Sequence, residues 1–223
     1  LTPYNPEGIE VAVASMASPA GATLAGRLGL SMLSLSATDA RGFDALDSNW
    51  GVRERVGADN GHPADRSRWR VVASMHLAET REQARAEVEH GILDLCGYME
   101  GMSKSKLPFA TSPGAALDHW MTNGLPVFGV PTVGTPDDAI ATIQRLVEKT
   151  GGFGSFLFLA NNCATWEATK RSYALFAETV IPAVRDMNAG RVASIDYVGD
   201  NASTFFGAMQ DATREAIAKY RPK

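Results

Sequence analysis

The chain has 223 residues, of which 45% are hydrophobic, 21% charged and 8% aromatic, and its formal net charge is −4. With 25 acidic against 21 basic residues it lacks the positive surface that binds a phosphate backbone, so we expect no nucleic acid partner. No apolar run reaches the roughly 18 residues that cross a bilayer, no signal peptide is recognisable and only two cysteines occur, so we expect no membrane contact and a reduced, cytoplasmic setting.

The first part of the chain predicts a strand, a short helix and a second strand. A β-branched run at Ile9–Ala14 is typical of a short buried strand. Ser18 then offers an N-cap oxygen, Pro19 suits the first helical position, and small residues at Ala20–Leu28 predict the helix. A second apolar run at Leu30–Leu35 follows at once, which makes a βαβ unit with parallel strands.

The alternation of strands and helices continues along the chain. Further predicted strands are Trp69–Leu77 and Gly154–Ala160, and further predicted helices are Phe43–Gly61, Thr80–Met99, Thr135–Gly151, Thr165–Met187 and Thr204–Tyr220. Four strands that alternate with helices predict a parallel α/β protein.

One long segment breaks this periodicity. Prolines and glycines interrupt the chain between Ser103 and Pro131, where only Ala115–Met121 has a helical pattern. Such an irregular segment inside a compact domain is more often a functional lid than a plain connector.

The first strand–helix junction carries the clearest chemical pattern. Its residues are Ala17, Ser18, Pro19, Ala20 and Gly21. They combine a hydroxyl, a helix amino terminus with unpaired N–H groups, and a glycine that would let a ligand approach the backbone. The pattern predicts a small anion site suited to a phosphate, although a plain helix cap explains the same residues.

Other catalytic patterns are absent from the sequence. No GxGxxG, GxxxxGK[ST] or GxSxG motif occurs, and the four histidines show no paired-ligand spacing, so we expect no metal site. His76 differs from the others because it lies near the carboxyl end of a predicted strand, where α/β proteins place their ligands; it is either a packed strand-end residue or a functional one. We expect most of the four tryptophans to be packing residues.

Several motifs in one order resemble a known family. They are Ala14–Gly29, Trp69–Val72, His76–Thr80, Gly134–Ala139, Gly151–Gly154 and Trp166–Thr169 with Ile181–Pro182. These resemble the second half of the bacterial luciferase-like flavin-dependent monooxygenases, most closely the limonene-monooxygenase-like branch. One position departs from luciferase itself, which carries an acidic residue where this chain has Ala17.

The resemblance implies a (β/α)8 TIM barrel of which this chain supplies strands five to eight. Residues 1–187 would form the second half of the barrel, with an irregular insertion at 103–131, and residues 188–223 a helical extension. The chain begins at Leu1, and we expect it to be the carboxyl-terminal part of a longer enzyme. Exposed sheet edges should make it associate with an N-terminal barrel half or with copies of itself.

The resemblance also implies a function. Such enzymes use reduced FMN, often supplied by a separate reductase, and O2 to oxygenate a small organic substrate, and the protein mainly positions the flavin and excludes water. The flavin phosphate would lie at the junction described above, Ser34 and Ser36, with Thr38, would line the ring pocket, and His76 is the one catalytic candidate. Two alternatives remain: a non-catalytic flavin-binding or barrel-completing subunit without turnover on its own, and a deazaflavin-dependent oxidoreductase of the same fold.

Overall fold

The structure is a computed structural model that describes residues 9–185 and 196–219. The chain divides into two compact units, Leu1–Val184 and Arg185–Lys223. In the second unit, residues 196–200 are helical and helix α10 spans Ala202–Lys219, which begins two residues before the helix predicted from Thr204. The domain boundary predicted at residue 187 lies outside the described residues.

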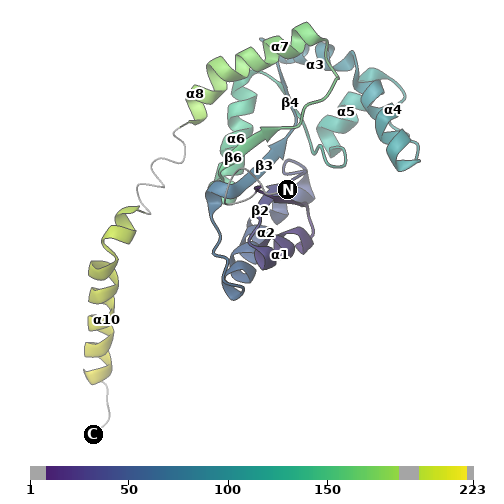
Figure 1. The fold of residues 1–223 in the computed structure, drawn as a ribbon. Coiled ribbons are helices and arrows are strands. Elements are labelled where there is room, and N and C mark those ends of the chain that lie inside the picture. The colour runs from purple at the N-terminus through teal and green to yellow at the C-terminus, as the bar shows by residue number, and fades with distance from the viewer. Residues whose placement is uncertain (1–8, 186–195, 220–223) are drawn as a thin grey trace. The chain divides into compact units, whose positions relative to one another are not determined.

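A four-stranded parallel sheet forms the centre of the first unit (Figure 1). Its strands are β1 (Ala12–Ser15), β2 (Ser31–Ser34), β3 (Trp69–Ala73) and β6 (Ser155–Phe158), and they lie side by side in that order. All three neighbouring pairs are parallel. The four predicted strands are therefore present, each shorter than the apolar run that predicts it, and the molecule is an α/β protein.

A second, two-stranded sheet corrects one of these predictions. The run Trp69–Leu77 is not one strand: after Ser74 the chain leaves the main sheet, and β4 (Met75–Leu77) pairs in parallel with β5 (Thr132–Gly134). The Thr132 N–H donates to the Ser74 carbonyl oxygen at 2.9 Å, which fixes this second pairing at the point where the strand turns.

The helices follow the sequence pattern with two differences. They are α1 (Ala20–Leu28), α2 (Ala40–Asp59), the 3-10 turn η1 (Arg66–Arg68), α3 (Arg81–Glu89), α4 (Ile92–Ser103), α5 (Pro113–Asn123), α6 (Pro136–Thr150), α7 (Trp166–Leu175), the π-helical turn η2 (Phe176–Val180) and α8 (Ile181–Val184). The predicted helix Thr80–Met99 is broken at Gly91, whose N–H donates to the Cys163 carbonyl oxygen at 2.6 Å. The segment after Ser103 is also less irregular than expected, because α5 spans eleven residues of it.

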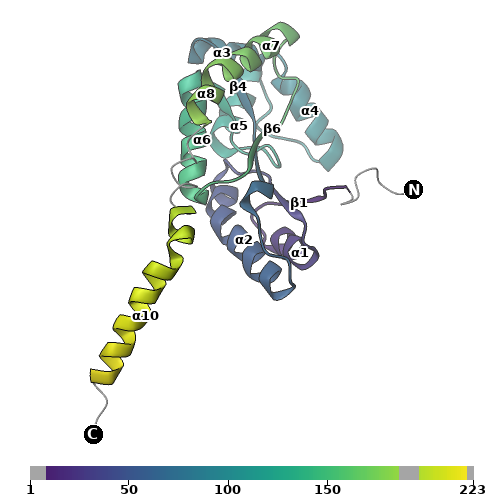
Figure 2. The same cartoon turned by 60° about the vertical axis from the view of Figure 1, so that its left-hand side comes forward.

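Helices that pack one against the next cover the sheet. Helix α1 packs on α2, α2 on α6, and α6 on η2 and α8, so they form a continuous layer along the sheet (Figure 2). Within the described residues β1 and β6 are the edges of the sheet, and both are more exposed than β2 and β3.

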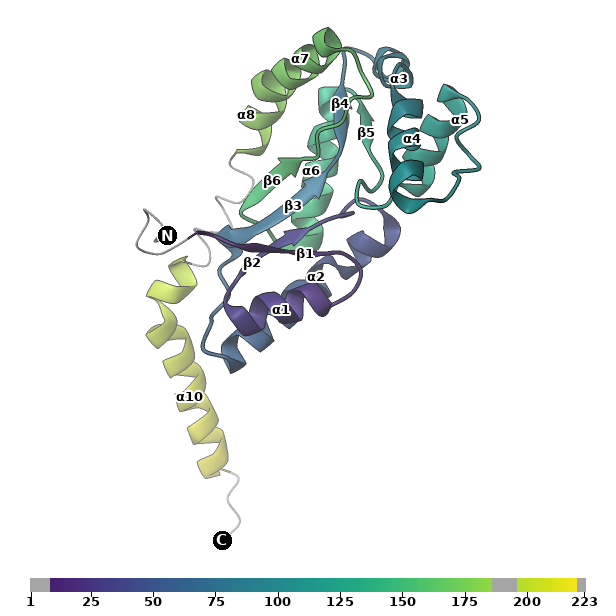
Figure 3. The same cartoon turned by 45° about the vertical axis from the view of Figure 1, so that its right-hand side comes forward.

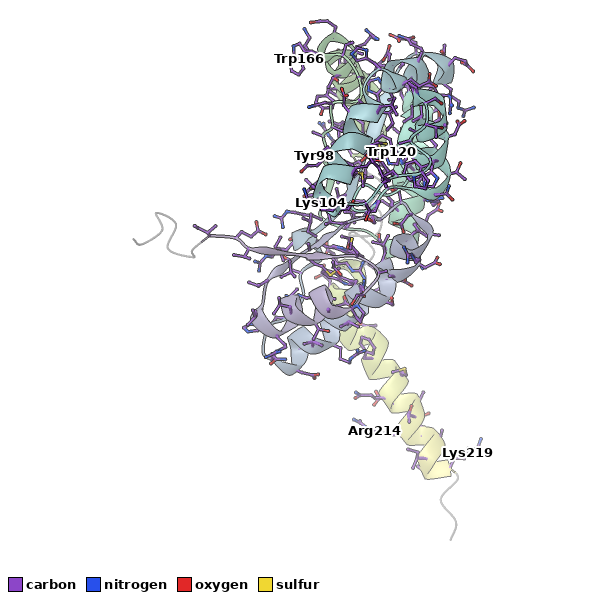
Figure 4. All side chains as sticks on the ribbon, turned by 90° about the vertical axis from the view of Figure 1, so that its right-hand side faces the viewer. Tyr98, Lys104, Trp120, Trp166, Arg214 and Lys219 are labelled. Carbon is purple, nitrogen blue, oxygen red and sulfur yellow. The ribbon has the colours of Figure 1, made fainter. Side chains whose placement is uncertain are left out.

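Three of the four tryptophans anchor the interior, as expected. Trp50 and Trp69 stack at 4.6 Å between ring centroids, and Trp120 donates its indole N–H to the Gly129 carbonyl oxygen at 2.9 Å. Figure 4 shows Trp120 inside the molecule and Trp166 on its outside; their exposed fractions are 1% and 68%.

None of the helices in the described part of the chain is long and apolar enough to cross a membrane.

Asp138 fixes the start of α6 and ties it to α3. Its Oδ2 accepts hydrogen bonds from the Thr135 N–H at 3.0 Å and the Thr135 hydroxyl at 3.1 Å, and Arg81 donates to both carboxylate oxygens at 2.9 and 2.6 Å. The Arg81 hydrogen bonds, aided by those from Thr135, hold the pKa of this carboxyl well below its ordinary value against the opposing effect of burial.

We expect Asp138→Asn to lower the free energy of unfolding at neutral pH. Because the pKa is lower in the folded than in the unfolded chain, the carboxylate stabilises the fold above the unfolded value of about 4, and the contribution is lost as the pH falls toward the folded value. Urea denaturation of wild type and variant should therefore differ most at neutral pH and progressively less below about pH 4. Asp137→Asn, at an exposed position in the same helical turn, should lose only the helix-dipole interaction of about 0.3–1 kcal/mol. Equal effects of the two substitutions would contradict the role of Asp138.

Candidate functional site

A cavity of about 720 Å³ opens where β1 and β2 end. Figure 3 shows the two strands running side by side, with α1 and α2 following them. The lining residues come from the β1–α1 junction (Ala14, Ser15, Met16, Ala17, Ser18, Ala20 and Gly21), the β2–α2 junction (Leu35, Ser36, Asp39, Arg41 and Gly42) and the segment after α5 (Asn123, Gly124, Leu125, Pro126 and Val127). Four of the five residues of the predicted anion site thus line one cavity together with Ser36. The fifth, Pro19, does not line it.

The β1–α1 junction presents the amino terminus of α1 to this cavity. The helix begins at Ala20 with Pro19 as its N-cap, so the sequence prediction placed the cap one residue too early. Ser18 still acts on the helix start, because its hydroxyl oxygen accepts a hydrogen bond from the Ala20 N–H at 3.3 Å. The Thr23 N–H donates to the Pro19 carbonyl oxygen at 2.9 Å, which leaves the Gly21 and Ala22 N–H groups and the positive end of the helix dipole for an anion.

Gly21 serves packing rather than ligand approach. A Cβ built on Gly21 would lie 2.4 Å from the Ala14 carbonyl oxygen and 3.1 Å from the Ser15 Cα. The space for a side chain is therefore filled by the end of β1, which corrects the reason given for this glycine from the sequence. Its absence of a side chain lets α1 start directly against the strand and so sets where the helix amino terminus lies.

We expect Gly21→Ala to destabilise the protein by about 1–3 kcal/mol, the usual cost of overpacking. Gly51 provides a matched control in the interior of α2, since a Cβ there meets nothing within 4 Å. Gly51→Ala should stabilise slightly through helix propensity. The two free energies of unfolding from urea titrations should move in opposite directions, and a neutral Gly21→Ala would contradict the packing role.

Asn49 stabilises the β1–α1 junction through hydrogen bonds. This buried side chain, 4% exposed, extends from α2 and donates a hydrogen bond to the Met16 carbonyl oxygen at 2.6 Å, with a longer contact of 3.5 Å to the Ser15 hydroxyl. A buried amide that satisfies a loop carbonyl fixes the loop conformation. The loop that carries the predicted anion site is therefore held in place by Asn49.

The cavity lining also contains two non-glycine residues in the left-handed region, one from the β2–α2 junction and one from the segment after α5. Ser36 has φ +53° and its N–H donates to the Val127 carbonyl oxygen at 3.2 Å; Val127 itself has φ +71°. Leu125 and Gly129 pair across this short turn. A β-branched residue at positive φ is strained, and such strain is found at functional sites more often than elsewhere.

Four of the predicted residues do not line the cavity: Pro19, Ser34, Thr38 and His76. Thr38 lines a separate cavity instead. The Ser34 hydroxyl oxygen accepts a hydrogen bond from the Trp69 indole N–H at 2.9 Å, and His76 lies 2.7 Å from the Glu87 carboxylate. Both side chains are buried, at 4% and 8% exposure. The structure therefore gives Ser34 and His76 packing partners elsewhere, and their predicted cofactor and catalytic roles gain no support from it.

The His76 contact belongs to a polar network between β4, α3 and α7. Gln83 donates to the Glu87 Oε1 at 2.9 Å, and Arg171 also donates to this oxygen. Burial acts to raise the pKa of the Glu87 carboxyl, but the hydrogen bonds from His76 and Gln83 and the charge of Arg171 together lower it. Glu87 is thus a charged anchor that joins three elements.

Other groups in the described part of the chain are less suited to chemistry. A second cavity of about 520 Å³ is lined by Arg81 and Asp138 among others. The Asp138 carboxylate already accepts hydrogen bonds from Arg81. Cys96 and Cys163 are buried, and burial raises the pKa of the Cys163 thiol to about 12. No group of three or more His, Cys, Asp or Glu residues is placed to hold a metal ion in residues 9–185 and 196–219.

The charged residues of the cavity, Asp39 and Arg41, were not predicted from the sequence. Asp39 is the N-cap of α2, where its Oδ1 accepts a hydrogen bond from the Gly42 N–H at 2.7 Å, and Arg41 follows two residues later. An aspartate N-cap directly after a predicted strand is the signal that could have found them.

Comparisons with known proteins agree with these features. The chain is 40% identical over 182 residues to limonene 1,2-monooxygenase from Rhodococcus erythropolis, a match covering 82% of the chain and 45% of the relative. It is 32% identical over 205 residues to 4-hydroxyprotoasukamycin monooxygenase from Streptomyces nodosus subsp. asukaensis, covering 91% and 54%. The chain thus spans about half the length of the curated relatives it matches.

A solved structure points in the same direction. The oxygenating constituent of 3,6-diketocamphane monooxygenase from Pseudomonas putida, a type II Baeyer-Villiger monooxygenase solved in complex with FMN, superposes with a TM-score of 0.55 and 27% identity over 78% of this chain and 48% of that one. No family model matches the chain. The relatives, the parallel α/β fold and the motifs identified from the sequence agree, and the chain belongs to the luciferase-like monooxygenase family.

Proposed function

We propose that this chain carries the phosphate-binding side of a flavin-dependent monooxygenase that uses reduced FMN and O2 to oxygenate a small organic substrate. The observation that carries the proposal is the cavity at the ends of β1 and β2, into which the amino terminus of α1 opens. A relative of 27% identity was solved in complex with FMN, which supports flavin as the ligand.

The residues of the cavity fit such a cofactor. At about 720 Å³ the cavity lies within the range of small-molecule sites, roughly 300–1,000 Å³. The first-turn N–H groups of α1 and the Ser18 hydroxyl would hold the phosphate. Leu35, Leu125 and Val127 provide an apolar wall that would orient the ring system and exclude water.

Reduced flavin, when bound, would supply the reaction with dioxygen, and the chain's own residues would orient the flavin and exclude water from it. Within the described residues the cavity lining holds no histidine, cysteine or lysine, and its one carboxylate, Asp39, caps α2, so the role proposed for these residues is to bind and orient the cofactor. The phosphate contacts would fix one end of the cofactor, and Val127, in its left-handed turn, would offer apolar surface to the rest of it.

We also propose that β1, β2, β3 and β6 form half of a (β/α)8 barrel. Their parallel order and the helical layer support this arrangement, as do the luciferase-like neighbours. Four further strands would have to pair with the free edges of β1 and β6.

Anaerobic fluorescence titration with reduced FMN tests the proposed function, followed by oxygen uptake in the presence of a flavin reductase. Limonene is the first substrate probe, because a relative of 40% identity is named for it. Binding with substrate-dependent oxygen uptake is the expected result. Binding without any turnover would favour the non-catalytic flavin-binding subunit, and absence of FMN binding would refute the proposal.

A further inference from the structure

Arg41 stands out among the residues of the 720 Å³ cavity because of its charge. It is the one cationic side chain in the cavity lining, and Asp39 is the one anionic side chain. Arg41 is exposed and forms no hydrogen bond or ion pair with the part of the chain that the structure describes. Its guanidinium is therefore available to a ligand.

The negative charge of Asp39 in the cavity lining gives Arg41 a role. The Asp39 carboxylate caps α2 through the Gly42 N–H at 2.7 Å, so it is held at the cavity as part of the fold. A phosphate dianion in the same cavity would meet this negative charge. The partial charge of about +0.5 at the start of each of α1 and α2 offsets only part of the phosphate charge, and Arg41 adds a full positive charge.

We propose that Arg41 is the cationic partner of the flavin phosphate and sets the preference of this site for FMN over riboflavin. The inference rests on the proposed function, since it needs flavin in this cavity. Arginine matches phosphate oxygens with two parallel N–H donors, a geometry that lysine cannot supply. The phosphate would then be contacted by Ser18 and the start of α1 and also by Arg41 near the start of α2, which all line the same cavity.

Arg41→Gln tests this role against a matched control. Arg55 is exposed on the same helix and does not line the cavity, so Arg55→Gln makes the same change in net charge away from the site. Dissociation constants for FMN and riboflavin should be measured for wild type and both variants, at low and at high salt.

Arg41→Gln should weaken FMN binding by about tenfold or more while leaving riboflavin binding unchanged. The FMN affinity of the variant should also depend less on salt than that of wild type, since one charge pair is gone. Arg41→Lys should restore part of the affinity, and Arg55→Gln should behave as wild type.

The outcomes separate this inference from the proposed function. If wild type binds FMN and Arg41→Gln keeps the FMN-to-riboflavin ratio of wild type, the role of Arg41 is refuted and the proposed function stands. If Arg41→Gln weakens FMN and riboflavin equally, Arg41 supports the fold of the site and not the phosphate, which also refutes the inference. If wild type binds neither flavin, the proposed function itself fails.

Discussion

Replacing Ala20 by glutamate should weaken FMN binding by about a hundredfold without destabilising the fold. Ala20 is the exposed first residue of α1 and lines the cavity. A carboxylate there would lie within a few ångströms of the phosphate, where two like charges repel by about 4 kcal/mol at an effective dielectric constant near 20. Part of this repulsion would be relieved by side-chain rotation, which leaves the hundredfold loss.

The same substitution should act in the opposite direction on stability. An acidic residue in the first turn of a helix interacts favourably with the helix dipole, typically by about 0.3–1 kcal/mol. Binding and stability therefore change with opposite signs, which a general loss of structure cannot mimic. Ala20→Gln, of the same size without the charge, should keep most of the FMN affinity. Equal losses for Ala20→Glu and Ala20→Gln would show that size, not charge, matters at this position.

Trp69→Ala should be the most destabilising single change in the described core. Trp69 is 0% exposed, stacks on Trp50 at 4.6 Å and donates its indole N–H to Ser34 at 2.9 Å. Truncation of a buried tryptophan costs about 3–5 kcal/mol, a large part of the roughly 5–15 kcal/mol that stabilises a typical domain. It also leaves the Ser34 hydroxyl without its indole partner.

Trp166→Ala is the matched control, because this indole is 68% exposed at the start of α7. Urea denaturation followed by circular dichroism should show a large shift of the midpoint for Trp69→Ala and almost none for Trp166→Ala. A folded Trp69→Ala variant with a midpoint near that of wild type would contradict the packing described for β3.

The main elements of the fold could be predicted from the sequence because they depend on local patterns. The helix Ala20–Leu28 has the predicted bounds, and the capping residues at the start of α6 mark its first turn correctly. The errors lie where long-range contacts decide. A three-residue strand, Thr132–Gly134, is too short to show a period, and the break at Gly91 depends on the distant Cys163 carbonyl.

The candidate site shows the same division between local and distant information. That Ser18 and Gly21 line one cavity could be predicted because they lie within a few residues of each other, whereas the anion itself stays a prediction. The contribution of Asn123–Val127 could not, since this segment reaches the cavity only through the fold. Ser34 has the right position in its strand, but its hydroxyl is bonded to Trp69, and the alternation along a strand does not show which hydroxyls are already engaged.

The most direct test of the flavin site compares FMN with riboflavin on the wild-type chain. If the start of α1 holds the phosphate, FMN should bind much more tightly than riboflavin, and inorganic phosphate should compete with FMN but not with riboflavin. Equal affinities for the two flavins, or FMN binding that phosphate does not affect, would show that the cavity at the ends of β1 and β2 does not hold the phosphate of the cofactor.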